Sequence, residues 1–428
     1  MRRFYTSNPK KRLELLIERD YARTETVDKL KDGLSVDLAD QMVENAFGIY
    51  GLPYGLAFNF LVDEKDYVVP MATEEPSVIA GASGAAKTIR SAGGFTTQIH
   101  SRQMLGQAAL MDVDQAEEAI QIIQEQEEVL IQTAHAAYPS IVKRGGGVRS
   151  LSVEYLPATE TEQDFVVVYL SVDTQEAMGA NMLNTMLEGI SPLLEEMTGG
   201  TALMSILSNY ATDSLVTARC EIPFELLKYK KIEGEELAQK ISAASQLAQS
   251  DVYRAATHNK GIMNGVDALV LATGNDWRAV EAGMHAYAAR DGQYRGLSRW
   301  WIEDTSLIGE ITAPLAVGTV GGSIKLHPYA QATFEILNIE SGQTGAANEL
   351  ASLIASLGLA QNFAALRALV SEGIQKGHMA LQAKSLAISA GAESDEVQAV
   401  VRQLKQTKPM NQAAARAILD QYRENKNK

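Results

Sequence analysis

Apolar and polar positions along the first hundred residues predict helices mixed with short strands. Apolar residues recur at helical spacing over residues 8–31 and predict an opening helix. Residues 56–62 form an apolar run between turns rich in glycine and proline, which predicts a strand. Residues 76–92, rich in alanine, serine and glycine, predict a second helix that Gly93 and Gly94 would end.

The next block has a different pattern, in which two strands follow each other directly. Helical periodicity covers residues 114–137, strands are predicted at 150–156 and 165–172, a helix at 176–197, and another strand at 215–222. This order is typical of a split β-α-β unit. The strands form a hairpin without helical crossovers, and no G-x-G-x-x-G follows a strand, so a doubly wound dinucleotide fold is not expected.

The last third alternates helix and strand before it becomes helical. Apolar runs at 267–272 and 315–320 predict strands. Helices are expected over 364–389, from a cap at Ser394 through Leu404, and over 411–422. Gly373 and Gly377 would interrupt the first of these helices.

Together these patterns predict an α+β fold with an insertion. We expect a large mixed α/β domain from residues 1–104 and 212–376. A small ferredoxin-like, non-Rossmann domain of residues 105–211 would be inserted in it, and residues 377–428 would form a C-terminal helical segment.

Composition narrows the class of protein. The 428 residues carry a net charge of −15, which argues against nucleic acid as the main partner. We expect a cytoplasmic protein without a membrane partner, because the single cysteine, Cys220, allows no internal disulfide, no signal peptide is visible, and no apolar run approaches the length of a membrane span. The six histidines lack metal-ligand spacing, so no metal is expected.

Eight short segments combine acidic, basic, amide and glycine residues. They are ENAFG (44–48), PYGLA (53–57), MATEEPS (71–77), EAMGAN (176–181), NKGIMNG (259–265), TGNDWR (273–278), GTVGG (318–322) and GHMA (377–380). In these segments, and in their order, the chain resembles the soluble, bacterial-type (class II) 3-hydroxy-3-methylglutaryl-CoA (HMG-CoA) reductases. It departs from the pattern at Glu176, where many relatives have aspartate.

The resemblance implies an activity and an assembly. It implies reduction of HMG-CoA to mevalonate and coenzyme A by two hydride transfers, as a step of isoprenoid synthesis. It implies that the large domain binds substrate, that the small domain binds the nicotinamide cofactor, and that the C-terminal segment is a mobile flap. It also implies a homodimer, or an oligomer built from dimers, with active sites at the subunit interface.

Two matched residues would act on the reacting carbonyl. Lys260 would stabilise the developing oxyanion, held on a tight loop by Gly261 and Gly265. Asp276 would hydrogen-bond Lys260 and position it. The alternatives are a surface or ion-paired lysine and a turn aspartate.

Two further residues match the family's proton donors. Glu75, directly before Pro76, would donate a proton to the substrate oxygen, and burial near Asp276 would raise its pKa. His378 would protonate the coenzyme A thiolate, because imidazolium is the stronger acid. As alternatives, Glu75 begins a helix that its charge favours, and His378 stabilises a helix end.

Other matched residues would bind substrate and cofactor. Ser77, Arg254, Asn264 and Asn209 are candidate substrate anchors, since an arginine fork suits a carboxylate. Backbone N–H groups at a helix start would face the cofactor phosphates, and the alternative is a small-residue helix start packed on the sheet. The candidate cofactor contacts are Glu176, Met178, Gly179, Ala180, Asn181 and Gly321.

Two cations favour one cofactor over the other. Lys143 and Arg144 lie in a stretch without acidic residues, which predicts NADPH preference with NADH possible. The alternative is that they complement a helix C-terminus. Two other functions remain open: NAD-linked oxidation of mevalonate, and a non-catalytic acyl-CoA-binding protein.

Overall fold

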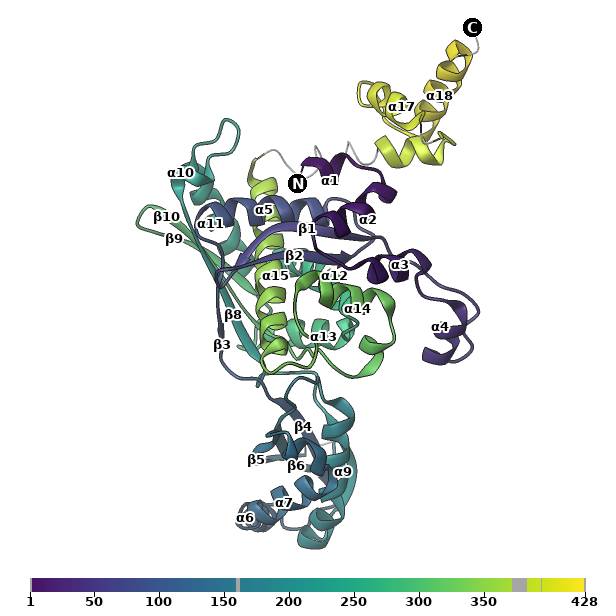
Figure 1. The fold of residues 1–428 in the computed structure, drawn as a ribbon. Helices are drawn as coiled ribbons and strands as arrows, with labels where there is room; N and C mark the ends of the chain where they lie inside the picture. The colour runs from purple at the N-terminus through teal and green to yellow at the C-terminus, as the bar shows by residue number, and fades with distance from the viewer. Residues whose placement is uncertain (1, 159–161, 372–382, 394, 427–428) are drawn as a thin grey trace.

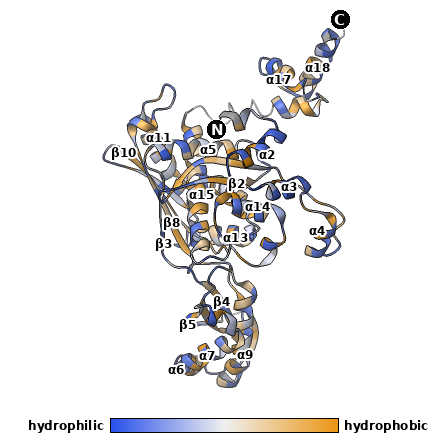
Figure 2. Ribbon diagram, viewed as in Figure 1, coloured by the Kyte–Doolittle hydropathy of each residue, from blue (hydrophilic) through white to orange (hydrophobic). Residues whose placement is uncertain are grey.

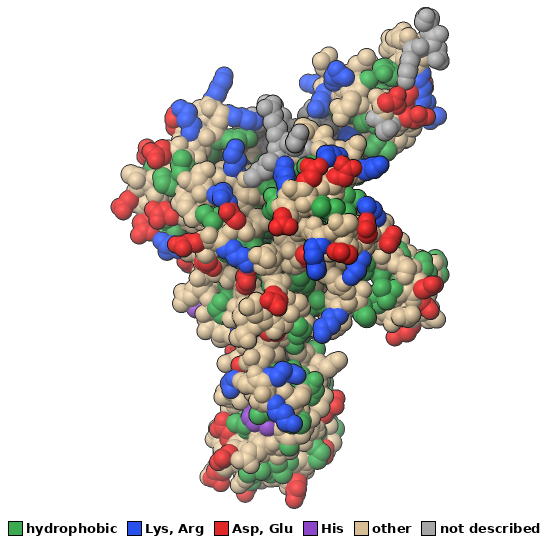
Figure 3. Space-filling view, viewed as in Figure 1, with side chains coloured by type: hydrophobic (Ala, Val, Ile, Leu, Met, Phe, Trp, Pro, Cys, Tyr) green, Lys and Arg blue, Asp and Glu red, His purple; other side chains and the backbone are tan. Residues whose placement is uncertain are grey.

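The computed structural model describes residues 2–158, 162–371, 383–393 and 395–426. It has three parts: a large body, a small unit at one end, and a C-terminal group of helices at the other (Figure 1). The small unit joins the body through a narrow connection, and a notch separates the C-terminal helices from the body (Figure 3). Each part has its own apolar core.

Four short helices open the chain, and the first three pack beside a two-stranded antiparallel hairpin. They are α1 (Arg2–Thr6), α2 (Pro9–Glu18), α3 (Thr24–Asp32) and α4 (Val36–Met42), and the hairpin is β1 (Tyr54–Val62) with β2 (Lys65–Ala72). The predicted single helix over 8–31 is therefore wrong. The chain breaks after α2, where Asp20 adopts a left-handed φ of 58°. The strand predicted at 56–62 is confirmed as β1.

The body is built on a four-stranded antiparallel sheet in the order β3-β8-β10-β9. Its strands are β3 (Thr96–Ile99), β8 (Leu215–Pro223), β9 (Ser298–Glu303) and β10 (Ser306–Pro314). Its helices are α5 (Val78–Ser91), α10 (Phe224–Leu227), α11 (Gly234–Ser250), α12 (Val252–Ala272), α13 (Trp277–Ala288), the 3-10 helix η1 (Gly322–Lys325), α14 (Pro328–Leu337) and α15 (Ala346–Ser371).

The central helix α15 was predicted to begin 18 residues too late, at residue 364 instead of 346. Most of its residues are apolar (Figure 2), and it packs against α5, α11, α12 and the sheet. A helix with no polar face lacks the periodicity that identifies an amphipathic helix. Its 26 residues are long and apolar enough to span a bilayer, which corrects the expectation of no such run; 67% of its most apolar window is buried inside the protein, as in a core helix.

Two predicted strands of the body are wrong. Residues 267–272 are the last turns of α12, and residues 315–320 form an extended loop with one isolated bridge, from Val320 to Ala177. A short apolar run does not distinguish a strand from a buried helix segment.

The small unit has its own antiparallel sheet, in the order β5-β6-β4-β7. Its elements are β4 (Met104–Met111), α6 (Ala116–Glu125), α7 (Glu127–Ala137), α8 (Pro139–Lys143), β5 (Gly147–Leu156), β6 (Phe165–Asp173), α9 (Ala180–Thr198) and β7 (Thr201–Leu207). The chain order β-α-β-β-α-β with this strand order is the ferredoxin-like topology. The overall fold class is thus α+β, as predicted.

Three details of the small unit differ from the prediction. Strands β4 and β7 were not predicted, and the strand at 215–222 is β8, which belongs to the sheet of the body. The helix expected over 114–137 is two helices that meet at Gln126. The helix expected from residue 176 begins only at Ala180, so residues 176–179 form a connecting loop.

The C-terminal part is helical where it is described. Residues 383–389 are helical, and α17 (Val397–Leu404) packs against α18 (Gln412–Lys426). The expected helix breaks at Gly373 and Gly377 and the expected cap at Ser394 lie outside the described residues.

Candidate active site

An ion pair lies at the edge of a cavity of about 380 Å³ in the body. The Nζ atom of Lys260, on α12, lies 2.5 Å from Oε2 of Glu75. Glu75 precedes α5, and the cavity is enclosed by α5, α12 and the C-terminal half of α15. The structure therefore brings together two of the four predicted catalytic residues.

We expected Lys260 on a tight loop, but it lies in the interior of α12. One of its two neighbouring glycines, Gly265, has a packing role. A Cβ at Gly265 would lie 3.0 Å from Cβ of Gln361 on α15, so glycine allows the two helices to approach closely. Lys260 thus projects from a helix held by packing, and its side chain stays 60% exposed.

Three of the four predicted substrate anchors line the same cavity: Ser77, Arg254 and Asn264. Ser77 is the N-cap residue of α5, in a left-handed conformation with φ of 74°. The Nε atom of Arg254 is buried and has no partner among the described residues, and burial lowers the pKa of its guanidinium. An unpaired buried donor favours a ligand that accepts its hydrogen bond.

One lining residue was missed. Gln361 lies on α15, and its Oε1 atom is buried without a partner in the described part of the chain. No pattern in the sequence marks it, because it occurs within a long apolar helix. The spacing between α12 and α15 brings it to the cavity.

The fourth predicted anchor, Asn209, is placed elsewhere. It lines a very small cavity beside Met178 and Pro314 and shares no cavity with Ser77 or Arg254.

A second cavity, of about 540 Å³, lies where the small unit meets the body. Its lining includes most of the predicted cofactor contacts: Met178, Gly179, Ala180, Asn181 and Gly321. The N-terminus of α9 opens into it. Gly321 and Gly322 have φ of 95° and 50°, and a Cβ on either would meet nothing within 4 Å, so their backbone is open to a ligand.

Asp276 also lines this second cavity. Its Oδ1 atom accepts hydrogen bonds from the N–H groups of Arg278 and Ala279, at 3.0 and 3.2 Å, and so caps α13. Arg278, a cation that sequence reasoning did not select, lines the cavity too. Within the described chain Asp276 has no bond to Lys260, so the predicted contact does not form inside one subunit.

Helix geometry explains this separation. Lys260 lies twelve residues before Ala272, where α12 ends, and Asp276 follows shortly after. At 1.5 Å per residue the two backbones are separated by ~18 Å along the helix axis. The two cavities have no described lining residue in common.

Glu176, which we also expected to contact the cofactor, is not among the described residues that line the second cavity. Its carboxylate accepts hydrogen bonds from the N–H groups of Gly345 and Ala347, both at 2.7 Å. It therefore caps α15 from the small unit. Its carbonyl oxygen also accepts a bond from the N–H of Thr319 at 2.8 Å, which fixes the connecting loop to the body.

The predicted cations Lys143 and Arg144 are exposed at the end of α8 and do not line the second cavity. His378 lies outside the described residues. Within the described ranges, no cluster of three or more His, Cys, Asp or Glu residues could hold a metal.

A buried polar network supports α12 behind Lys260. The Nε2 atom of His258 lies 2.7 Å from the hydroxyl of Ser298 and 3.1 Å from Nδ2 of Asn362. Burial, with a smaller contribution from Arg254, lowers the pKa of His258 to about 3. The network therefore requires a neutral imidazole, and it ties α12 to β9 and α15.

Comparisons with known proteins identify the family of the chain. The family model described as hydroxymethylglutaryl-coenzyme A reductase matches residues 8–383. The 3-hydroxy-3-methylglutaryl-coenzyme A reductase of Archaeoglobus fulgidus is 42% identical over 98% of this chain and 94% of its own length. A probable enzyme of the same name from Borreliella burgdorferi is 34% identical over 82% of this chain and 78% of its own.

Solved structures extend the likeness to three dimensions. The reductase from Streptococcus pneumoniae has a TM-score of 0.83 and 53% identity, covering 99% of both chains. A structure of the class II enzyme from that organism, bound to NADPH in open conformations, has a TM-score of 0.82 and 54% identity, covering 86% of this chain and 99% of its own. The chain therefore belongs to the hydroxymethylglutaryl-coenzyme A reductase family, and it is an oxidoreductase of the class II type.

Proposed function

We propose that the protein reduces HMG-CoA to mevalonate and coenzyme A with NADPH, as a step of isoprenoid synthesis. The observation that carries this proposal is the Lys260–Glu75 pair beside a cavity lined by Arg254, whose Nε atom is buried without a partner among the described residues. A cation, an acid and an anchor for an anion are the groups that reduction of an anionic thioester requires.

The substrate cavity supplies the carbonyl chemistry. Lys260 stabilises the negative charge that develops on the substrate oxygen as it is reduced. Glu75, 2.5 Å away, is placed to give that oxygen a proton through or beside the ammonium group. Arg254, Ser77 and Asn264 hold the carboxylate and hydroxyl of the acyl group, and Gln361 offers its unpaired oxygen to a substrate donor.

The second cavity fits a dinucleotide. The start of α9, with Gly179, Ala180 and Asn181, presents backbone N–H groups that suit phosphates, and Gly321 leaves room for a close approach. NADPH bound there would supply the hydride for each reduction. Because residues 177–179 and the start of α9 line this cavity, we assign cofactor binding to the small unit, with boundaries at residues 105–211.

The separation of the two cavities supports a dimer. One chain carries Lys260 and Asp276 too far apart to act together, although the family motif needs both. We propose that Asp276 of the partner subunit approaches Lys260, so that each active site combines the substrate cavity of one copy with the cofactor cavity of the other. Asn209, near Met178, would then reach the site from the cofactor side.

The remaining proton donor is assigned by resemblance. His378 would protonate the departing coenzyme A thiolate from a flap of residues 377–428. The position of α15 supports this role, since its last described residues line the substrate cavity and the chain continues from there toward His378.

The experiment that tests the proposal follows NADPH consumption by the full chain with and without HMG-CoA, in parallel with NADH. We expect HMG-CoA-dependent oxidation that favours NADPH, with mevalonate and free coenzyme A as products. A folded protein that consumes neither cofactor would leave acyl-CoA binding as the function. Greater efficiency with NADH would favour the alternative, mevalonate oxidation.

Cofactor preference has a more specific test. The double variant K143Q/R144Q should lower catalytic efficiency with NADPH and leave that with NADH unchanged, because only NADPH carries the additional phosphate. R278Q is compared with this double variant, since Arg278 is a cation that lines the cofactor cavity. If R278Q alone reduces the preference, the selective cation is Arg278 and not the predicted pair.

A further inference from the structure

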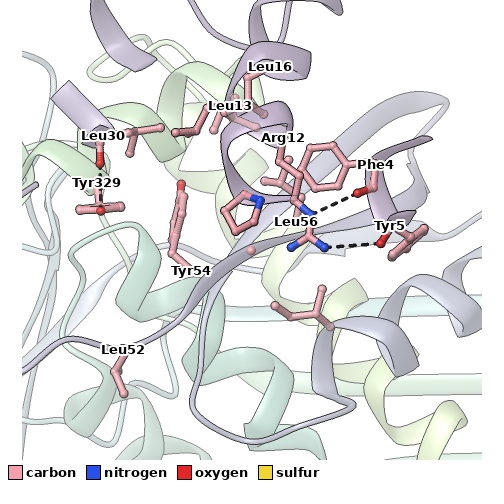
Figure 4. Close-up of a pocket in the computed structure, with 14 residues that line it drawn as sticks. Phe4, Tyr5, Arg12, Leu13, Leu16, Leu30, Leu52, Tyr54, Leu56 and Tyr329 are labelled. Carbon is pink, nitrogen blue, oxygen red and sulfur yellow. Dashed lines mark hydrogen bonds between the residues drawn. The ribbon is translucent and has the colours of Figure 1, made fainter. Parts of the chain in front are cut away.

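A third cavity lies apart from both of the others, between the N-terminal helices and the β1–β2 hairpin (Figure 4). Its volume is about 490 Å³, within the range of small-molecule sites. Helices α1 and α2, strand β1, two residues of α14, and one residue each of α3 and α5 line it.

Its lining is apolar with one exception. Leucine, phenylalanine, tyrosine and proline side chains make up most of it, and Arg12 is the single charged residue among the described lining residues. In Figure 4 the guanidinium group of Arg12 lies among these side chains, near Phe4 and Tyr5. An apolar cavity with one placed charge is typical of a site for an amphipathic ligand.

Arg12 keeps unused hydrogen-bonding capacity. Its Nε donates to the carbonyl oxygen of Phe4 at 3.1 Å, and its Nη2 donates to that of Tyr5 at 3.4 Å. A guanidinium group has five N–H donors, so three remain. Its Nη1 has no hydrogen-bond partner among the described residues, which leaves donors for a carboxylate.

We propose that this cavity binds a small monocarboxylate with an unbranched apolar chain, its carboxylate on Arg12 and its chain among Leu13, Leu16 and Leu56. At ~30 Å³ per water-sized group, the cavity accommodates roughly sixteen such groups, close to the size of dodecanoate. A ligand with several phosphates does not fit this chemistry, because the described lining offers a single cation to balance their charge.

The cavity is coupled to the active site through α5. Ile79 lines the third cavity, whereas Ser77, Val78 and Gly81 line the substrate cavity. Helix positions two residues apart point to opposite sides, so the first turn of α5 separates the two cavities. A Cβ at Gly55 would lie 2.8 Å from Cδ1 of Ile79, so Ile79 has little room to yield on that side.

The structure therefore assigns a regulatory role to the ligand. A ligand in the third cavity that displaces Ile79 would shift Ser77 and Glu75. This shift would change the KM for HMG-CoA. The effect on KM rests on the proposed reductase function, whereas binding of the carboxylate does not.

Titration calorimetry of the full chain with dodecanoate, below its micelle concentration, tests the site. We expect one molecule bound per chain, with butyrate and 1-dodecanol binding at least tenfold more weakly. R12Q should weaken binding at least tenfold, R12K less, and L13W should abolish it by filling the cavity. The control K10Q removes an exposed cation of the same helix outside the cavity and should bind as the parent does.

Other results would overturn the site. Equal affinity for 1-dodecanol together with an unaffected R12Q would mean that no anion is recognised. Multiple binding that survives L13W would mean adsorption to the surface. If dodecanoate does not bind and L13W changes the oligomeric state, the cavity is instead an interface with a second copy. Since the readout is heat and not turnover, failure of the reductase function would leave the binding result unaffected.

Discussion

The substrate cavity and the cofactor cavity are built in different ways. The first is formed by three helices, and Lys260 projects from the interior of α12, where close packing against α15 holds it. The second is formed by loops around residues 177–179, 274–276 and 320–322, together with the N-termini of α9 and α13.

This difference matters for how each cavity is stabilised. The helices of the substrate cavity share the large apolar core of the body. The loops of the cofactor cavity depend on a few polar contacts across the junction, such as the carboxylate of Glu176 on α15. We therefore expect the substrate cavity to tolerate change at the junction, and the cofactor cavity to be sensitive to it.

The largest effect is expected at Lys260. K260M should reduce kcat by about 100- to 1000-fold, the typical effect of losing one group that stabilises an oxyanion. Its melting temperature should stay near that of the parent, because the side chain is largely exposed. K240M is the matched control, since Lys240 forms a comparable pair with Glu236 on α11. Retention of activity within a few-fold would contradict the role of Lys260.

A mixing experiment tests whether the two cavities belong to different copies. K260M and D276N should each be inactive alone. Co-expressed in equal amounts, they should recover about a quarter of parental activity, because half of the dimers are mixed and each mixed dimer has one intact site. If both residues of a site came from the same chain, no activity would return.

The junction should respond to loss of charge at Glu176. E176Q leaves two backbone N–H groups at the start of α15 facing a neutral amide and should lower the free energy of unfolding by about 1–3 kcal/mol. If the contact positions the cofactor cavity, the KM for NADPH should rise severalfold while the KM for HMG-CoA stays unchanged. E188Q, an exposed position on α9, is the control. Equal changes in both KM values would indicate general destabilisation instead.

The smallest expected effect is the pH dependence of stability that comes from His258, in the buried network behind Lys260. The pKa of His258 in the folded protein, about 3, lies below the unfolded value of 6.5. The unfolded chain therefore binds a proton first, and stability falls as the pH drops below about 6.5, by about 1.4 kcal/mol per pH unit.

Urea unfolding at pH 7 and pH 5 measures this contribution. Between pH 7 and pH 5, the free energy of unfolding of the parent should fall by about 2 kcal/mol more than that of H258Q, because the glutamine amide does not titrate. An identical loss in both proteins would show that other groups cause the acid sensitivity.

Local patterns predicted much of the fold and part of the site. The strand at 56–62, the helix at 76–92 and the hairpin of the small unit follow from short apolar runs, local composition and nearby turn residues. The predictions failed where an element is buried on all sides, because the contrast between apolar and polar positions is then lost. The end of α12 and most of α15 are apolar on nearly every side, so one was mistaken for a strand and the other was begun too late.

The candidate site divides in the same way. The motifs select Glu75, Lys260 and Asp276, and Glu75 and Lys260 form a pair. They do not reveal that Glu176 caps a helix of the body, nor that Gln361 reaches the substrate cavity. Both facts depend on elements separated by more than 80 residues along the chain.

By itself, then, the sequence determined the family, the α+β class and the residue types of the chemistry, because motifs and periodicity are local properties of the chain. Only the tertiary structure decided which of those residues meet. Lys260 forms an ion pair with Glu75. Asp276 lies beyond the end of α12, about a dozen helical residues from Lys260, because a helix is rigid and fixes distance along its axis. That separation, and not any motif, supports a site completed by a second copy.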